Sequence, residues 1–84
     1  MYMEKENIKN QVQEIFREIL DEKGLLLDRE TTAADVDGWD SLSHIQLIVG
    51  IEKKFNVKFS SREILSWKNI GELLDSLYSK VGIR

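Results

Sequence analysis

Between residues 4 and 22 the apolar side chains recur at the spacing of one helix face, and this pattern constrains the fold more than any other feature of the chain. The apolar positions are Ile8, Val12, Ile15, Phe16, Ile19 and Leu20. Spacings of three and four residues place them on one stripe, and the intervening Glu, Lys, Gln and Arg residues favour helix. A base and a glycine follow at Lys23 and Gly24, which predicts that the helix ends there with the glycine in the left-handed conformation.

Three further helices are predicted downstream. They run from Asp40-Ser41 to about Phe55 or Asn56, over Ile64 and Leu65, and over residues 69–78 with Ile70, Leu73, Leu74, Leu77 and Tyr78 inward. Ser60 and Glu63 have the spacing of a capping box, and Asn69 and Glu72 repeat it. The predicted fold class is therefore all-α: a small four-helix bundle of three long helices and one short helix.

A long loop, residues 25–40, joins the first helix to the second. Its apolar residues are Leu25–Leu27 and Val36, and we expect them to pin the loop to the core. Asp37-Gly38 is a turn signal. Loops of this length without secondary structure are uncommon in compact domains and are often functional.

Length and composition limit the classes of function. A chain of 84 residues, 42% hydrophobic and 32% charged, predicts a single folded domain over residues 1–84. With no cysteine and one histidine, His44, disulfides, thiolate metal sites and sites with two imidazoles are excluded. No apolar run approaches the ~20 residues of a membrane span, and the N-terminal segment lacks the apolar region of a signal peptide. We therefore expect a cytoplasmic protein.

Charge is distributed unevenly along the chain. Residues 1–40 hold eleven acidic and five basic side chains, a net of −6, whereas residues 41–84 hold four acidic and seven basic, a net of +3. Nucleic-acid binding requires a basic stripe. The acidic half opposes it, so we expect no nucleic-acid partner.

The second helix carries two apolar faces where a small bundle needs only one. Leu47, Ile48, Ile51 and Phe55 form the face predicted to enter the core. Leu42, Ile45 and Val49 form a second face on another side of the helix. That face is either covered by the long loop or exposed to a partner.

Ser41 stands where this helix begins. A serine at such a position is often only a helix cap. Asp40 can fill that role, however, which would leave Ser41 in the first turn with its hydroxyl in solvent. A phosphate ester there would face unpaired backbone N–H groups and the positive end of the helix dipole.

The motifs around this serine resemble a known family. They are Gly38-Trp39-Asp40-Ser41-Leu42, then Ile45-Gln46-Leu47, then Ile51-Glu52-Lys53-Lys54-Phe55-Asn56-Val57, and finally Asn69-Ile70-Gly71-Glu72-Leu73. Together they are similar to the acyl carrier proteins over about residues 4–80. The Asp40-Ser41-Leu42 signature resembles the family's attachment site for 4′-phosphopantetheine.

The resemblance implies a carrier protein, a phosphoprotein without catalytic activity of its own. A phosphopantetheinyl transferase would move phosphopantetheine from coenzyme A onto Ser41. The terminal thiol of that arm would hold acyl intermediates as thioesters for acyl-activating, condensing or acyltransferase enzymes of lipid or secondary-metabolite biosynthesis. The implied partner surface is the second helix, with Leu42, Ile45, Gln46, Val49 and Trp39 as its residues. We expect a monomer.

In the acyl carrier proteins the second helix usually presents acidic residues to basic patches on partner enzymes. This chain departs from that pattern. The exposed positions of its second helix are predicted to be Ser43, Gln46, Lys53 and Lys54, with Glu52 the only acid after Asp40. The acidic residues lie in the preceding loop, at Asp28, Glu30, Asp35, Asp37 and Asp40. Because charge complementarity governs partner choice, we interpret the chain as a specialised carrier and not the one of general fatty-acid synthesis.

Other interpretations remain open from the sequence. The same arm and serine would serve an aminoacyl or peptidyl carrier, and an unmodified helical adaptor could bind partners through Leu42, Ile45 and Val49.

His44, one turn after Ser41, suggests a Ser–His dyad, although a third orienting group and an oxyanion hole are not evident. We interpret His44 as a boundary residue near the loop and Trp67 as part of the core. Trp39 is either a loop anchor or a wall for cargo or partner.

Overall fold

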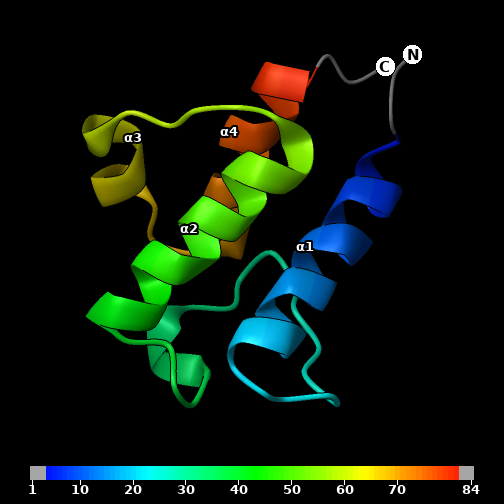
Figure 1. Ribbon diagram of the computed structural model, residues 1–84, viewed down its shortest axis with the longest axis vertical. Coiled ribbons are helices and arrows are strands. Elements are labelled where there is room, and N and C mark those ends of the chain that lie inside the picture. The colour runs from blue at the N-terminus through cyan, green and yellow to red at the C-terminus, as the bar shows by residue number, and fades with distance from the viewer. Residues whose placement is uncertain (1–3, 82–84) are drawn as a thin grey trace.

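A computed structural model describes residues 4–81, and this part of the chain is all-helical (Figure 1). The elements are α1 (Lys5–Ile19), the short 3-10 helix η1 (Ala33–Asp35), α2 (Ser41–Phe55), α3 (Ser61–Ser66) and α4 (Ile70–Val81). The predicted four-helix bundle, three long helices and one short, is confirmed. None of these helices is both long and apolar enough to cross a lipid bilayer.

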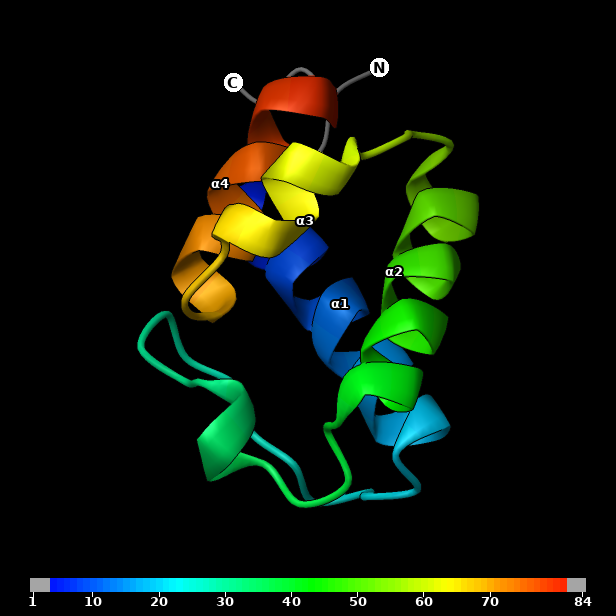
Figure 2. The same cartoon turned by 90° about the vertical axis from the view of Figure 1, so that its left-hand side faces the viewer.

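One face of each long helix is buried in a shared core. The buried apolar residues are Ile8, Val12, Phe16, Leu27, Val36, Leu47, Ile48, Ile51, Phe59, Ile70, Leu73, Leu74 and Leu77. In Figures 1 and 2, α2 and α4 run opposite to α1. The predicted core face of α2 is confirmed at Leu47, Ile48 and Ile51, while Phe55 is half-buried.

The first helix ends earlier than predicted, and it ends without a glycine. The last helical residue is Ile19 and the cap is Leu20. Asp21 takes the left-handed conformation, with φ 55°, and the Glu22 N–H donates to the Arg17 carbonyl at 3.0 Å. Short polar side chains such as Asp tolerate this conformation. The left-handed role predicted for Gly24 is therefore wrong.

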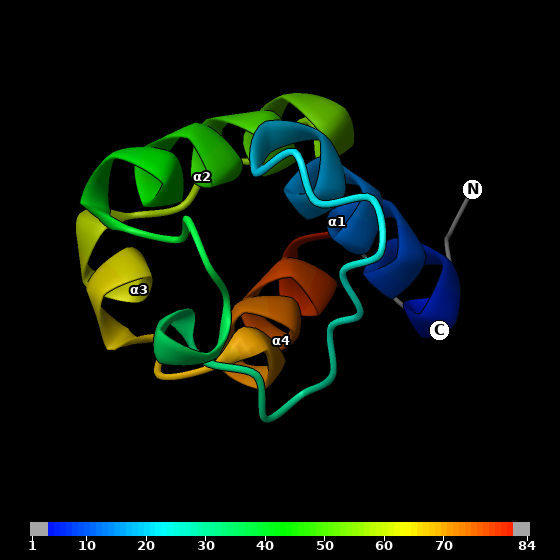
Figure 3. The ribbon, with the colours of Figure 1, turned by 90° about the horizontal axis from the view of Figure 1, so that it is seen from below.

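The long loop crosses beneath the bundle, from the end of α1 past the start of α4 to the start of α2 (Figure 3). Leu27 and Val36 are buried and Leu25 is half-buried, as predicted. Leu26 is 76% exposed, so its predicted role as an anchor is wrong. Consecutive side chains of an extended segment point to opposite sides, and therefore only the residues flanking Leu26 reach the core.

The middle of the loop is fastened to the first turn of α4. The N–H of Ile70 donates to the Thr31 carbonyl at 2.9 Å, and that of Gly71 donates to the Arg29 carbonyl at 2.8 Å. The Arg29 guanidinium also donates twice to the Asp75 carboxylate, at 2.9 and 3.1 Å. The first N–H groups of a helix lack partners inside it, so the loop satisfies two of them.

The short α3 follows a reciprocal capping box, as predicted. The Ser60 hydroxyl accepts from the Glu63 N–H at 3.1 Å, and the Glu63 carboxylate accepts from the Ser60 N–H at 2.9 Å. At α4 the Asn69 side chain accepts from the Glu72 N–H at 2.9 Å. The Glu72 carboxylate accepts from the Lys68 N–H, at 3.2 Å. Only half of the capping box predicted for Asn69 and Glu72 therefore forms: Asn69 caps the helix, but the Glu72 carboxylate bonds to the Lys68 N–H and not to the Asn69 N–H.

Candidate functional site

The start of α2 is fixed by a capping box between Asp40 and Ser43. The Asp40 carboxylate accepts from the Ser43 N–H at 3.0 Å, and the Ser43 hydroxyl accepts from the Asp40 N–H at 2.8 Å. The hydrogen bond from the Ser43 N–H lowers the pKa of the Asp40 carboxyl. Of the two residues that the sequence offers as the cap, Asp40 is the cap and Ser41 is the first residue of the helix.

Ser43 is not the exposed residue that the sequence pattern predicted. It is only 8% exposed, and its hydroxyl donates to the Gly38 carbonyl at 2.6 Å. The third residue of a helix lies where its side chain can turn back to the cap. Ser43 uses that position to join the helix to the Gly38 turn, where φ is +85°. The prediction for Ser43 was wrong for this reason.

Ser41 is exposed and is left free by this arrangement. Among residues 4–81, neither its hydroxyl nor its N–H has a hydrogen-bond partner. A free N–H at the positive end of a helix favours an anion. The site therefore has the chemistry that a phosphate ester on the Ser41 oxygen requires: an accessible hydroxyl and a stabilising environment for the phosphate charge.

Beside Ser41 an apolar patch on α2 faces solvent. We call Leu42, Ile45 and Val49 the α2 patch; they are 70%, 61% and 42% exposed. Gln46 is exposed within the same turn of the helix. The loop does not cover this face, so of the two alternatives left by the sequence the structure supports exposure.

The outward face of α2 carries no free acid. Glu52 is half-buried, and its carboxylate accepts from the Phe59 N–H at 2.9 Å. Lys53 and Lys54 are exposed. The five acids of the loop are exposed, so negative charge lies before the helix and positive charge lies at its end. In the part of the chain that is described, no cluster of three His, Asp or Glu side chains could hold a metal ion.

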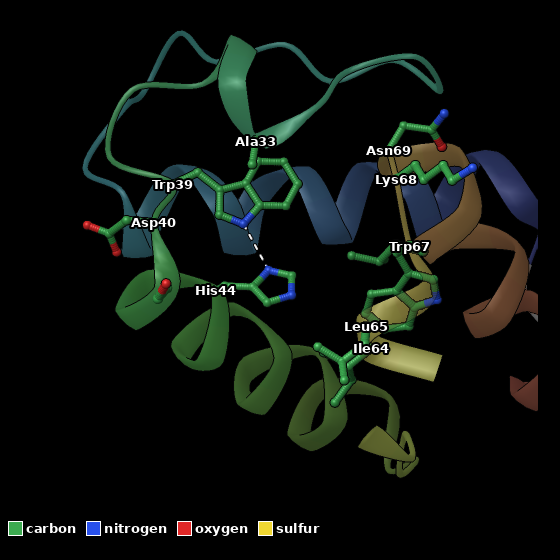
Figure 4. A pocket seen from close by; sticks show the side chains of 11 residues that line it. Ala33, Trp39, Asp40, His44, Ile64, Leu65, Trp67, Lys68 and Asn69 are labelled. Carbon is green, nitrogen blue, oxygen red and sulfur yellow. Dashed lines mark hydrogen bonds between the residues drawn. The ribbon is translucent and has the colours of Figure 1, made fainter. Parts of the chain in front are cut away.

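Trp39 and His44 form a hydrogen-bonded pair between the loop and α2. The indole Nε1–H donates to His44 Nδ1 at 3.0 Å, so the two rings lie edge to edge, with an interplanar angle of 26° and their centroids 5.9 Å apart (Figure 4). Phe16 meets the Trp39 ring edge-on, with centroids 5.0 Å apart. Trp39 therefore anchors the loop, and His44 is the boundary residue that the sequence predicted.

This pair argues against a Ser–His dyad. Because His44 Nδ1 accepts a hydrogen bond, the neutral ring carries its proton on Nε2. Nε2 is then a donor, whereas a general base for Ser41 needs a free lone pair. Burial lowers the pKa of His44, which keeps the ring neutral.

A cleft of about 450 Å³ opens between α2 and the segment from α3 to α4. We call it the aromatic cleft: Trp39 and His44 lie on one side, and Ile64, Leu65 and Trp67 lie on the other (Figure 4). Ser41 is also among its lining residues. Sequence reasoning missed it, because its walls come from three segments that are distant in the chain.

The comparisons with known proteins agree with this geometry. Residues 10–77 match the family described as "Phosphopantetheine attachment site". The solution structure of holo acyl carrier protein from Geobacter metallireducens is 41% identical, with a TM-score of 0.82 over 87% of this chain and 84% of that chain. A putative acyl carrier protein from Mycobacterium tuberculosis, 24% identical, shares the fold, with a TM-score of 0.78 over 86% of this chain and 96% of that one.

The match over residues 10–77 identifies a helical carrier domain of the phosphopantetheine-attachment family. Within that class, the chain belongs to the acyl carrier protein family, and its prosthetic group is 4′-phosphopantetheine. The resemblance noted in the sequence is confirmed.

Proposed function

We propose that the chain receives 4′-phosphopantetheine on Ser41 and presents acyl intermediates to partner biosynthetic enzymes. The observation that carries this proposal is the exposed Ser41 hydroxyl, which has no hydrogen-bond partner among residues 4–81. A transferase can reach this oxygen without disturbing the fold.

The neighbours of Ser41 have separate roles in the proposal. Asp40 caps α2 and so keeps Ser41 in the first turn, where the helix dipole stabilises a phosphodiester anion. Leu42 begins the apolar surface beside it. The arm supplies a terminal thiol that holds an acyl group as a thioester, a chemistry the chain lacks because it contains no cysteine. No catalytic group is needed in the carrier itself, and the Nδ1 lone pair of His44 is occupied by the Trp39 N–H.

Partner enzymes are proposed to dock on the α2 patch together with Gln46, and Trp39 borders the same end of the helix. These partners are the phosphopantetheinyl transferase and acyl-activating, condensing or acyltransferase enzymes. At protein interfaces fewer than about 30% of the residues cost more than ~1 kcal/mol when truncated, so we expect the binding energy to be concentrated in one or two residues of this surface. We propose that the carrier acts as a monomer, since the patch is then free for each partner in turn.

The test is an intact mass after incubation of the apo protein with coenzyme A and a broad-specificity phosphopantetheinyl transferase. We expect one added phosphopantetheine, and none on the Ser41→Ala variant. Ser61→Ala is the matched control, because Ser61 is also an exposed first residue of a helix that follows a capping residue. No addition under conditions that modify a control carrier, or addition that persists in Ser41→Ala, would contradict the proposal.

A helical adaptor that binds partners through the α2 patch independently of the arm is the second candidate, favoured by the exposure of that patch. Binding of a partner that is unchanged in Ser41→Ala would support it. Cargo of the aminoacyl type would use the same serine, and the mass of the loaded protein from its native host distinguishes the two carriers.

The charge of α2 further supports a specialised carrier. Lys53 and Lys54 stand on its outward face, and the acids lie in the loop. Enzymes that recognise an acidic helix would meet like charge there, which slows encounter. Turnover of the loaded protein by general fatty-acid synthesis enzymes, at the rate of their own carrier, would contradict this assignment.

A further inference from the structure

The aromatic cleft has walls that suit a flat guest. The hydrogen-bonded rings of Trp39 and His44 lie edge to edge, with an interplanar angle of 26°, and form one wall. Trp67 lies across from them (Figure 4). Aromatic faces contact other flat rings through stacked or edge-on arrangements, which stabilise beyond the area that is buried. A flexible alkyl chain gains only the free energy of burying its apolar surface.

Both tryptophans are held in place before any guest arrives. The Trp67 Nε1–H donates to the Ser76 hydroxyl at 2.9 Å, and its ring meets Phe59 edge-on at 4.9 Å. Trp39 is held by Phe16 and by its hydrogen bond to His44. Walls that are already ordered lose little side-chain freedom on binding, which favours affinity.

The cleft also offers a hydrogen-bond donor. His44 Nδ1 is occupied by the Trp39 N–H, so the ring proton lies on Nε2. Among residues 4–81, Nε2 has no hydrogen-bond partner, yet it is not an unsatisfied buried atom. It therefore reaches water or a guest with a suitable acceptor, such as a carbonyl oxygen.

Ser41 lines the same cleft. A group tethered to its oxygen is held at the high effective concentration that short flexible linkers provide, in the millimolar range. Even a weak contact with the walls is then populated. We propose that this carrier is selective for planar, aromatic acyl cargo, and that Trp39, His44 and Trp67 are the residues that recognise it. This inference rests on the proposed attachment at Ser41.

The test compares three cargoes on the full chain: benzoyl, cyclohexanecarbonyl and octanoyl groups, each loaded from its coenzyme A thioester and verified by intact mass. The benzoyl and cyclohexanecarbonyl groups have the same number of carbon atoms, and only the first is flat. The readout is the rate of thioester cleavage by hydroxylamine, divided for each cargo by the rate of the free pantetheine thioester. We expect about two- to tenfold protection of benzoyl, the range of an aromatic pair contact, and little protection of the other two.

Two substitutions of Trp67 separate the effect of a flat ring in the cleft from an effect on the stability of the fold. Trp67→Phe and Trp67→Leu both lose the hydrogen bond to Ser76, but only Trp67→Phe keeps a flat ring. Benzoyl protection should persist in the first and disappear in the second, with the folded state of each checked by circular dichroism. If Trp67→Leu does not fold, Trp39→Phe and Trp39→Leu provide a second pair.

Equal protection of benzoyl and cyclohexanecarbonyl, or stronger protection of octanoyl, would overturn the cargo inference alone. Absence of any added mass would contradict the proposed attachment, and the inference would fall with it.

Discussion

Replacing Ser43 by alanine tests how the start of α2 is held. The Ser43 hydroxyl makes two short hydrogen bonds: it accepts from the Asp40 N–H at 2.8 Å and donates to the Gly38 carbonyl at 2.6 Å, with the Asp40 carbonyl as a longer, alternative acceptor at 3.3 Å. Alanine keeps the helix but removes both bonds. The two backbone groups are then left without this partner at a site where Ser43 itself is only 8% exposed.

The expected cost follows from those two bonds. A net contribution of about 0.5–1.5 kcal/mol per hydrogen bond gives a loss of about 1–3 kcal/mol, and loss of capping interactions falls in the same range. In a domain of this size, 1 kcal/mol shifts the Tm by about 4–8 °C. A loss of 2 kcal/mol therefore lowers the Tm by about 8–16 °C.

The assay is urea unfolding followed by circular dichroism, with Ser41→Ala as the control. Ser41 is exposed and makes no bond to residues 4–81, so its substitution should change stability by less than about 0.5 kcal/mol. Ser43→Ala should remain a substrate for phosphopantetheine transfer when it is folded. A Ser43→Ala variant as stable as the parent, or an equally destabilised Ser41→Ala, would refute the reasoning.

Three further outcomes are expected. Gly71→Ala should destabilise by about 1–3 kcal/mol in urea unfolding, because a Cβ would lie 2.9 Å from the Arg29 carbonyl oxygen, whereas Gly24→Ala, with open space around it, should be close to neutral. Burial lowers the pKa of His44 below its ordinary 6.5, so the unfolded chain binds this proton more readily. The His44 contribution to stability should therefore be complete above pH 6.5 and decline as the pH falls below it; a His44→Gln variant with the same pH dependence would exclude this residue as the cause. Ile45→Asp, at a site that is 61% exposed, should leave the Tm within a few degrees but lower kcat/KM for phosphopantetheine transfer about fivefold or more, and an unchanged kcat/KM would remove Ile45 from the docking surface.

The two faces of α2 were predictable from the sequence because each depends only on helical period. Leu47 and Ile51 enter the core, and Leu42 and Ile45 face solvent, as their spacing indicates. The cap at Asp40 was also predictable, since Asp before a helical run is a strong signal. These features require no knowledge of distant contacts.

The errors arose where a side chain or a turn depends on its neighbours in space. Ser43 is a short polar residue, and the usual signal at its position is Glu or Gln; its bond to Gly38 is set by the loop. Asp21, not Gly24, is left-handed because the packed face of α1 ends at Leu20. Leu26 belongs to a run of three leucines, and only the backbone direction decides which of them is outside.

The aromatic cleft lay outside sequence reasoning altogether. Trp39 and Trp67 are 28 positions apart, and nothing local relates them. The Trp39–His44 hydrogen bond also depends on the course of the loop. Contacts of this kind are a property of the tertiary fold.

Because Arg29 and Thr31 are attached to the first turn of α4, two parts of the long loop differ in how well they tolerate inserted residues. Extra residues near Gly24 lengthen an exposed stretch that carries little of the fold, and loop entropy rises only slowly with length. Extra residues between Arg29 and Thr31 would shift the register of both carbonyls against α4. Peptide tags and reporter sequences are therefore best placed at Gly24.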